Sequence, residues 1–558
     1  MYWSKPNPMP ASNLVHMFQK WERETPHHIF FRQPVAGDWR TWTYQQAGEE
    51  IRKIASGLLA LNLPSRSNIA IVSKNCAHWI MADLAIFMAG HVSVPLYANS
   101  SAASIKQILE HSESKVIFVG KLDDYENQKK GIPGNVQKIS ASFYGIKDGL
   151  LWEDILEKQK PLANVVERGD EELLTIMYTS GTTGVPKGVM FNSKAFDHTT
   201  KILIKYLHAW ETLPEHPRLF SYLPLCHIAE RNLTEMLGSY SGATISFVES
   251  LESFGRDLAS VQPDLFFGVP RIWAKFQEKI LEKMPQKKLD KFLKIPILNS
   301  IVKKKIKKSL GLSKAGLKGT AAAPIPVSLL QWFNKLDIRL REIYGMTENC
   351  ALSHSNQKEI RFGTVGHAME TVEVKLSEEQ EILTRHVALM MGYYKEPEMT
   401  AQVMTSDGYL RTGDQGSISA DGFLTITGRV KDLFKTDKGK YISPAPIEMK
   451  LLKNSDIEQV CVVGMSIPQP IALVLLSAAG KAKSKEELVK SLSASVAEVN
   501  PTVEHYEELK KVVIMQEEWT INNGLMTPTM KVKRNEVEKL KVPSYPNWYA
   551  MEGLVVWE

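Results

Sequence analysis

Apolar and polar residues follow two different periods along the first part of the chain. Residues 44–61 and 78–90 carry apolar side chains at helical spacing, whereas 68–75 and 92–97 are short apolar runs typical of buried strands. Helices and strands that alternate in this order predict an α/β fold with mainly parallel sheets.

The pattern changes near residues 428–432, where a segment rich in lysine, glycine, aspartate and proline begins. Beyond it, residues 457–465 and 471–477 have the pattern of strands in a smaller α+β unit. A chain of 558 residues also exceeds what one hydrophobic core usually supports. We therefore expect a large N-terminal domain of several subdomains, residues 1–430, and a small C-terminal domain, residues 431–558.

Composition narrows the functional classes. With 44% apolar and 23% charged residues the chain has an ordinary globular composition, and its four cysteines lack metal-ligand spacing. The first residues do not resemble a signal peptide, and no run of 18 apolar residues occurs. These features predict a cytoplasmic protein with reduced thiols, without a zinc site, a disulfide framework or a membrane span.

The positive charge is local. Residues 283–318 contain twelve lysines and one acid, a charge of +11 within a whole-chain charge of +6, so the remainder is net acidic. A nucleic-acid footprint needs a distributed basic patch with groove-reading or base-stacking motifs, and none is visible. We expect no nucleic-acid partner.

One predicted turn contains most of the residues that could bind a phosphate. An apolar run, 173–178, leads into the loop Thr179–Gly184, and "GVPKG" follows with Lys187. Glycines allow close backbone approach, hydroxyl and N–H groups donate hydrogen bonds, and a lysine adds positive charge, which together suit a polyphosphate. The spacing differs from a Walker A loop. A flexible surface loop is the alternative interpretation.

The same stretch, "YTSGTTGVPKGV", resembles the phosphate-loop signature of the adenylate-forming superfamily. "REIYGMTEN", "DGYLRTGDQG", "GRVKDLFKTDKGKYISPAPIE" and "TPTMKVKR" follow in the order that this superfamily uses. "SYLPLCHIAER" and "FFGVPRIWAKF" are most similar to long-chain fatty acyl-CoA synthetases. The resemblance covers nearly the whole chain and implies a large ATP- and acyl-binding domain followed by a small mobile one.

The resemblance implies two half-reactions. A carboxylate attacks the α-phosphate of ATP to give an acyl-adenylate and pyrophosphate, and the thiol of coenzyme A then displaces AMP. ATP, Mg²⁺ and coenzyme A are the implied small molecules, because an anionic carboxylate approaches an anionic phosphate only where positive charge is supplied. Glu348 and the Thr182 hydroxyl match the Mg²⁺ ligands; helix capping is the alternative role for Glu348.

The resemblance also implies which residues contact the nucleotide. Asp414 matches the acid that accepts ribose hydroxyls, Arg429 a nucleotide contact, and Tyr344 the aromatic ring stacked on adenine. A turn aspartate is the alternative for Asp414, and Ala321 departs from the family by standing where glycine is usual. The implied nucleotide-binding set is Thr179, Ser180, Gly181, Thr182, Thr183, Gly184, Lys187, Ala322, Tyr344, Gly345, Thr347, Asp414, Arg429 and Lys531.

Lys531, in "PTMKVKR", aligns with the near-terminal lysine that drives adenylation in the superfamily. Without the motif it would be read as a solvated surface lysine. Lys431 corresponds to the hinge about which the C-terminal domain rotates. That rotation would withdraw Lys531 and bring "KTDKGKY" to the site.

Two residues are assigned to the acyl end. His227, in "PLCHIAER", falls on a position that lines the carboxylate pocket, and Trp273, in "GVPRIW", resembles a tryptophan that gates the fatty-acyl tunnel. A structural histidine and a core tryptophan are the alternatives. No motif indicates the chain length.

These features predict a long-chain fatty acid:CoA ligase whose partners are fatty acid, ATP and coenzyme A. The alternatives are an acyl-adenylate-forming enzyme that uses another acceptor, such as a carrier protein, and a catalytically silent acyl-binding relative. The sequence leaves the oligomeric state open, a homodimer included.

The lysine-rich stretch, Lys283 to Lys318, is not required by this chemistry. After Pro296, Ile297, Leu298, Ile301, Val302, Ile306 and Leu310 fall near one helical face, and lysines crowd the rest. We expect either a helix with a solvated charged face or peripheral contact with anionic membrane, on the inner face.

Overall fold

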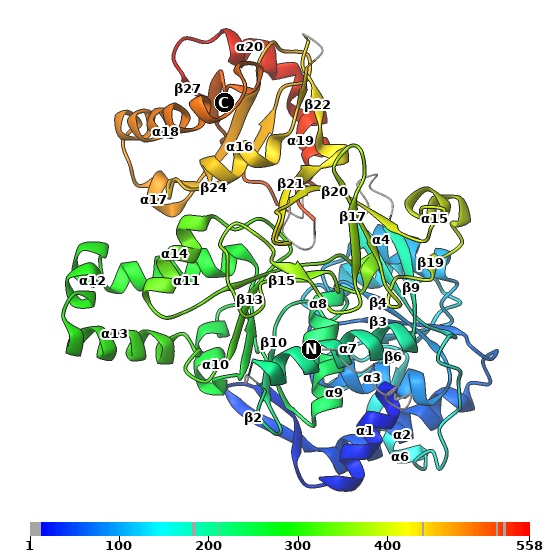
Figure 1. Cartoon of the computed structure of the whole chain (residues 1–558). Coiled ribbons are helices and arrows are strands. Elements are labelled where there is room, and N and C mark those ends of the chain that lie inside the picture. Colours follow the sequence, from blue (N-terminus) through cyan, green and yellow to red (C-terminus); the bar gives the residue numbers. More distant parts are fainter. Residues whose placement is uncertain (1–12, 181–185, 211–212, 438–439, 521–522, 528–531) are drawn as a thin grey trace.

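The computed structural model describes residues 13–180, 186–210, 213–437, 440–520, 523–527 and 532–558. Figure 1 shows a large lower body, which runs to strand β21, and a smaller upper body formed by the last part of the chain. The predicted fold class is confirmed: the chain is mixed α/β, with a large N-terminal and a small C-terminal domain.

An eight-stranded sheet forms the centre of the large domain. Its inner strands run parallel, whereas β8 and β9 form an antiparallel hairpin at one side. The order is β19 (Gly392–Tyr393), β9 (Pro186–Asn192), β8 (Leu173–Ser180), β4 (Val92–Leu96), β3 (Asn68–Val72), β5 (Val116–Val119), β6 (Gln137–Ser140) and β7 (Leu150–Leu151).

Three smaller sheets complete the large domain. The first orders β10 (Arg218–Ser221), β11 (Thr244–Phe247), β1 (Ile29–Val35) and β2 (Asp38–Thr43). The second orders β12 (Leu265–Phe267), β13 (Leu317–Thr320), β14 (Arg341–Tyr344), β15 (His354–Ser355) and β16 (His367–Ala368). The third is antiparallel and orders β17 (Glu373–Leu376), β18 (Glu381–Arg385), β20 (Leu410–Ile418) and β21 (Leu424–Arg429).

Helices cover the sheets of the large domain. Those of the first half are α1 (Leu14–Glu24), α2 (Tyr44–Ala60), α3 (Ala77–Met88), α4 (Ala102–Ser112), α5 (Tyr125–Gln128), α6 (Trp152–Lys158), α7 (Ser193–Ala209), α8 (Ile228–Glu230) and α9 (Leu237–Ser241). The later ones are α10 (Phe254–Val261), α11 (Pro270–Lys283), α12 (Gln286–Leu293), α13 (Pro296–Ser309), α14 (Val327–Lys335) and α15 (Pro397–Val403).

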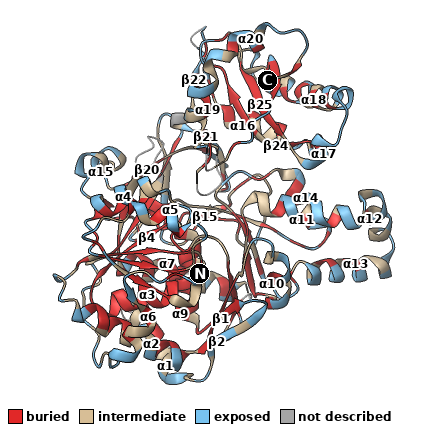
Figure 2. Cartoon of the chain, turned by 180° about the vertical axis from the view of Figure 1, so that it is seen from behind, coloured by how far each residue is buried: buried red, intermediate tan, exposed pale blue. Residues whose placement is uncertain are grey.

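The small domain is built on a four-stranded sheet with helices around it (Figure 2). Its strands are β24 (Ile457–Val463), β25 (Ile471–Leu476), β26 (Lys511–Ile514) and β27 (Val555–Trp557), with a two-stranded ribbon of β22 (Phe434–Lys435) and β23 (Tyr441–Ile442). Its helices are α16 (Pro444–Leu451), α17 (Ala478–Lys481), α18 (Lys485–Val499), α19 (Arg534–Lys541) and α20 (Tyr545–Ala550). Apolar clusters lie on both faces of the sheet.

The elements expected from periodicity occur where the sequence places them. α2, β3, α3 and β4 match the four segments of the first part, and β24 and β25 match the two strands of the small domain. The phosphate-loop prediction needs one correction: Thr179 and Ser180 continue β8, and β9 begins at Pro186, because the two strands pair across the loop out to these residues.

A fully buried ionic network ties helices to the central sheet. Arg231 begins a π-helical turn, Arg231–Met236, and donates to Asp83, to Glu235 at 3.1 Å and to Thr175 at 2.8 Å. Two acids and one cation cannot all remain charged without water, and burial together with the Asp83 charge raises the pKa of Glu235 well above its usual range. The network thus favours the protonated form of Glu235, beside the buried Arg231–Asp83 pair.

Glu230, next to Arg231, is a second buried acid. Its Oε1 accepts from the Ser221 and Thr234 hydroxyls at 2.8 and 3.0 Å and from the Tyr222 backbone at 3.2 Å. Burial nevertheless raises the pKa of this carboxyl to about 8. Glu230 is thus neutral in the folded chain over a range in which an exposed glutamate is ionised.

We predict that Glu230→Gln removes a pH-dependent loss of stability. Because the folded pKa lies above the unfolded value of about 4.5, the protonated carboxyl contributes fully to the free energy of unfolding below pH 4.5. Between pH 4.5 and about 8 this contribution falls by about 1.4 kcal/mol per pH unit, and it is lost above about pH 8. Thermal unfolding of both proteins between pH 5 and 8 measures this. The stability of the variant relative to that of the wild type should increase as the pH rises. A constant difference across this range would contradict the assignment.

Candidate active site

Two side chains contact Asp414 on strand β20. The hydroxyl of Tyr344, the last residue of β14, donates to Asp414 Oδ2 at 2.7 Å, and Arg429 Nε donates to Oδ1 at 2.8 Å. Asp414 and Arg429 are brought together because they are cross-strand partners in the antiparallel β20–β21 pair. The structure thus joins three of the predicted nucleotide contacts in one cluster.

The charge of Asp414 controls both of its neighbours. It raises the pKa of Arg429, and burial followed by the Asp414 charge raises the pKa of Tyr344 well above its usual value. Tyr344 therefore remains a neutral donor and Arg429 a cation. Asp414 keeps acceptor capacity beyond these two hydrogen bonds, since an ionised carboxylate has about four lone-pair positions.

Glu348 lies in a short 3₁₀ turn, Thr347–Asn349, directly after the Tyr344 cluster. Gly345 is required before this turn, because a Cβ there would lie 2.7 Å from the Ala351 backbone. Asn349 closes the turn by accepting the Met346 N–H at 2.8 Å, and Asn232, on the π-helical turn, donates to the Cys350 carbonyl at 2.8 Å. The buried ionic network next to Asn232 thereby anchors the backbone that carries Glu348.

Tyr393 connects Glu348 with the phosphate-loop hairpin. Its hydroxyl donates to Glu348 Oε1 at 2.9 Å, and Lys187 Nζ lies 5.3 Å from the centre of its ring. The strand that carries it, β19, pairs with β9, and the Met390 N–H binds the Glu348 carbonyl at 2.9 Å. Sequence reasoning missed Tyr393, for which the only signal is a tyrosine pair after a short apolar stretch.

The β8–β9 hairpin places Lys187 opposite Thr179. Gly188, beside the lysine, lacks room for a side chain, because a Cβ there would lie 2.7 Å from Ile176 Cγ2. The predicted residues Gly181, Thr182, Thr183 and Gly184 lie outside the described residues, as does Lys531. Of the phosphate cradle, the structure therefore describes the two strands that carry it.

The predicted adenine strip follows strand β13. Ala322 adopts a left-handed backbone with φ of 73°, a conformation that costs a non-glycine residue roughly 1 kcal/mol. Ala321, which stands where the family usually has glycine, directly precedes this left-handed residue. Thr347 is buried and begins the Glu348 turn.

His227 and Trp273 both make hydrogen bonds within the large domain. His227 Nδ1 accepts the Ala229 N–H at 3.3 Å and so caps α8, while its side chain is half-buried. Trp273 is fully buried on α11, where its Nε1 donates to the carbonyls of Gly268 and Gly319 at 3.1 and 3.3 Å. Gly319 belongs to β13, so Trp273 is tied to the strand that delivers the adenine strip. Its gating role and the acyl role of His227 remain predictions.

No group of three or more histidine, cysteine or acidic residues able to hold a metal occurs among the residues that the structure describes. Glu348 offers a single carboxylate, which suits Mg²⁺ that arrives on ATP, because this ion keeps several waters and binds one or two carboxylates besides phosphates. Glu348 therefore fits a Mg²⁺ ion that is held mainly by the nucleotide.

The small domain meets the large one at α11 and around β21. Arg271 of α11 donates to Glu458 of β24 at 2.5 Å, and the Ser443 hydroxyl reaches the Thr427 carbonyl at 3.4 Å. On either side of Lys531, the described residues Met526 and Val532 form a β-bridge. Gln459, next to Glu458, donates to Met526 Sδ at 3.7 Å. Lys431 lies in the connecting 3₁₀ turn, Val430–Asp432.

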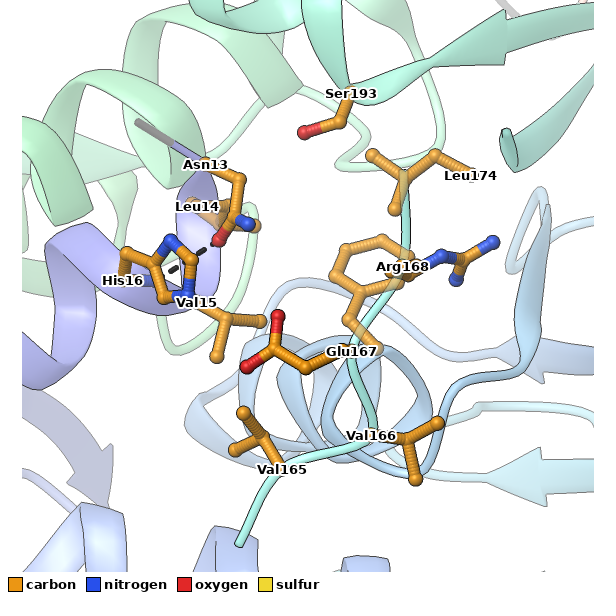
Figure 3. A pocket seen from close by; sticks show the side chains of 11 residues that line it. Asn13, Leu14, Val15, His16, Val165, Val166, Glu167, Arg168, Leu174 and Ser193 are labelled. Carbon is orange, nitrogen blue, oxygen red and sulfur yellow. Dashed lines mark hydrogen bonds between the residues drawn. The ribbon is translucent and has the colours of Figure 1, made fainter. Parts of the chain in front are cut away.

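Figure 3 shows a pocket that is not part of this site. It lies between the start of α1, where Asn13 caps the helix by accepting the His16 N–H at 2.9 Å, and the segment 165–168. None of its lining residues belongs to the predicted nucleotide or acyl set.

Comparison with known proteins agrees with these observations. Residues 18–394 match the AMP-binding enzyme family, and residues 431–540 match the AMP-binding enzyme C-terminal domain. A long-chain-fatty-acid–CoA ligase of Mycobacterium bovis is 27% identical over 94% of this chain and 95% of its own. A chloroplastic long-chain-fatty-acid–[acyl-carrier-protein] ligase of Arabidopsis thaliana is 26% identical over 89% and 81%.

Among solved structures, an anthranilate CoA ligase in complex with anthranoyl-AMP superposes with a TM-score of 0.78 at 19% identity, over 95% of this chain and 97% of that one. This likeness shows the fold. The family match covers more than half of the chain and includes the strands that carry Tyr344 and Lys187. The chain therefore belongs to the AMP-binding enzymes, the adenylate-forming superfamily that its motifs resemble.

Proposed function

We propose that the chain is an ATP-dependent long-chain fatty acid:CoA ligase, which forms an acyl-adenylate and then a thioester, with release of pyrophosphate and AMP. The observation that carries this proposal is the near full-length similarity to a long-chain-fatty-acid–CoA ligase, over 94% of this chain and 95% of that one. The Asp414 cluster supports it, because three residues implied to contact the nucleotide lie together there.

In the first half-reaction the described residues bind and orient the nucleotide. Asp414 accepts the ribose hydroxyls, Arg429 contacts ribose and phosphate oxygens, and Lys187 supplies positive charge beside the phosphates. Glu348 would hold the Mg²⁺ that arrives on ATP, and the ion would supply further charge neutralisation there. Tyr393 fixes Glu348 relative to Lys187 through its hydroxyl. Lys531 balances charge on the α-phosphate and the carboxylate as they react.

The second half-reaction requires the small domain to move about Lys431, which we take as the hinge and the domain boundary. The connection between the domains suits such a motion, because Arg271–Glu458 is a half-exposed pair and such pairs contribute little to stability. Rotation replaces Lys531 by the segment 435–441 at the same site.

The acceptor of the acyl group defines a second candidate function. The similarity to an acyl-carrier-protein ligase, at 26% identity, is the observation that supports a carrier protein as the acceptor in this second candidate. The two functions share the adenylation step and differ only in what receives the acyl group.

The proposal is tested with a panel of carboxylic acids from acetate to C20, each supplied with ATP and Mg²⁺. Pyrophosphate release is measured as the signal of adenylate formation. We expect the highest kcat/KM for long-chain acids, and acyl-CoA formation when coenzyme A is present. Preference for short or aromatic acids would contradict the substrate class. If the acyl group is transferred only to a carrier protein that bears its prosthetic thiol, the acceptor is the carrier protein and not coenzyme A.

We predict that Lys531→Ala lowers adenylate formation by about 10²- to 10³-fold, because one preorganised charge donor is lost. Thioester formation from supplied acyl-adenylate and coenzyme A should be preserved. Separate assays of the two half-reactions measure this, with Lys533→Ala as the matched control two positions away. Equal losses in both half-reactions would contradict a role confined to the first.

We predict that Trp273→Phe changes the KM for fatty acid and the chain-length preference far more than the KM for ATP. Phenylalanine keeps an aromatic ring among Phe266, Phe276 and Phe333, whose rings contact Trp273, but loses both indole hydrogen bonds. Trp273→Ala should add a loss of roughly 3–5 kcal/mol in stability. If the phenylalanine variant shows unchanged acid preference, Trp273 is a core residue only.

A further inference from the structure

Helices α12 and α13 form a hairpin that projects from the side of the large domain (Figure 1). Its inner face packs through Leu289, Val302 and Ile306, which join the buried cluster that contains Trp273, and Trp332 Nε1 donates to Gln286 Oε1 at 2.8 Å. The hairpin is therefore held on the body, and in Figure 2 its outer face is largely exposed.

The sequence expectation of one apolar face on α13 is only half right. Val302 and Ile306 are buried, with 9% and 7% exposure, whereas Ile297 and Ile301 are 75% and 55% exposed. Ile297, Ile301, Lys304 and Lys308 occur at i, i+4, i+7 and i+11 and so form one outward stripe along the helix. The stripe is apolar at its N-terminal end and basic at its C-terminal end.

Lysines continue the basic surface onto α12 and the turn that follows. Lys287, Lys291 and Lys294 are exposed at i, i+4 and i+7, and Ile295, beside them, is 41% exposed. Among the described residues, Lys303 is the one lysine of the hairpin with a carboxylate within salt-bridge distance, Asp337 at 3.2 Å. The outer face thus combines exposed isoleucines with exposed lysines that have no described carboxylate within salt-bridge distance, and Asp290 is the one acid of the hairpin.

We propose that this outer face of the α12–α13 hairpin docks on an anionic lipid bilayer. Ile295, Ile297 and Ile301 enter the interface between headgroups and acyl chains, and the surrounding lysines contact the headgroup charges. A solvated charged face would not require isoleucines that are exposed by more than half. A polyanion such as nucleic acid attracts the lysines but gives no stabilisation to the apolar end of the stripe.

The position of the hairpin gives the docking a use that rests on the proposed function. Leu289, Val302 and Ile306 belong to the same apolar cluster as Trp273, so the lipid-facing hairpin and the predicted acyl gate are packed against one continuous core. Long-chain acids partition into bilayers. A chain seated on the membrane takes its substrate from the lipid phase without passing it through water.

Binding is measured by cosedimentation of the full chain with vesicles of phosphatidylcholine containing phosphatidylserine, and with vesicles of phosphatidylcholine alone. The test variant carries Lys287→Gln, Lys291→Gln, Lys304→Gln and Lys308→Gln. A matched control carries glutamine at four exposed lysines on other surfaces, Lys106, Lys158, Lys160 and Lys490, and so has the same net charge. A second variant, Ile297→Ser with Ile301→Ser, tests the apolar end.

We expect the wild type to bind the anionic vesicles and to release them as salt shortens the screening length from about 8 Å to about 3 Å. At roughly fivefold per lysine, the test variant should lose about 10²- to 10³-fold in partition coefficient, and the serine variant about tenfold. The control should bind as the wild type, and all variants should keep their melting temperature.

Equal binding to neutral vesicles, equal losses in the test and control variants, or wild-type binding by the test variant would each overturn the proposal. Binding of the hairpin lysines to DNA with the same salt dependence, but no effect of the serine variant on vesicles, would also overturn it. These outcomes are independent of ligase activity, so failure of the proposed function would leave the vesicle result standing on its own.

Discussion

The carboxylate of Asp414 is the point on which the arrangement of the site depends. It accepts hydrogen bonds from the Tyr344 hydroxyl at 2.7 Å and from Arg429 Nε at 2.8 Å. These bonds join the end of β14 to the end of β21, the last strand before the small domain. Because Arg429 directly precedes the connecting turn Val430–Asp432, the group that would hold the ribose also fixes the base of the domain connection. The proposed function therefore couples nucleotide binding to domain orientation through this one acid.

The remaining parts of the site are linked to this acid by the backbone and by buried polar groups. The chain runs from Tyr344 through Gly345 into the turn of Glu348, and Tyr393 connects that turn with Lys187 on the phosphate-loop hairpin. Behind the turn, Asn232 belongs to the π-helical turn that begins at the buried Arg231. Helix α11 connects the domain contact with the lysine-rich hairpin. It carries Arg271, which pairs with Glu458 of the small domain, and Trp273, which lies in the apolar cluster that supports the hairpin.

Elements whose pattern is set by local sequence could be predicted. The periods of α2, α3, β3 and β4 and the short runs of β24 and β25 follow burial on one face or on both, and the ordered motifs place Tyr344, Asp414 and Arg429 in one cluster. Long-range packing could not be predicted. Tyr393 acts through a pairing between β19 and β9, strands that are far apart in the sequence. The division of the α13 isoleucines and valine between core and surface depends on what packs against them, and helical spacing does not encode that.

Calorimetric titration of AMP into the wild type and into Asp414→Asn tests the central claim most directly. Loss of hydrogen bonds to a charged acceptor typically costs 1.5–3 kcal/mol, so the account predicts an AMP dissociation constant about 10- to 150-fold higher in the variant. Asp421→Asn is the matched control, because Asp421 also pairs with an arginine, Arg361 at 2.6 Å, but lies outside the site. Wild-type affinity for AMP in a folded Asp414→Asn chain would contradict the account.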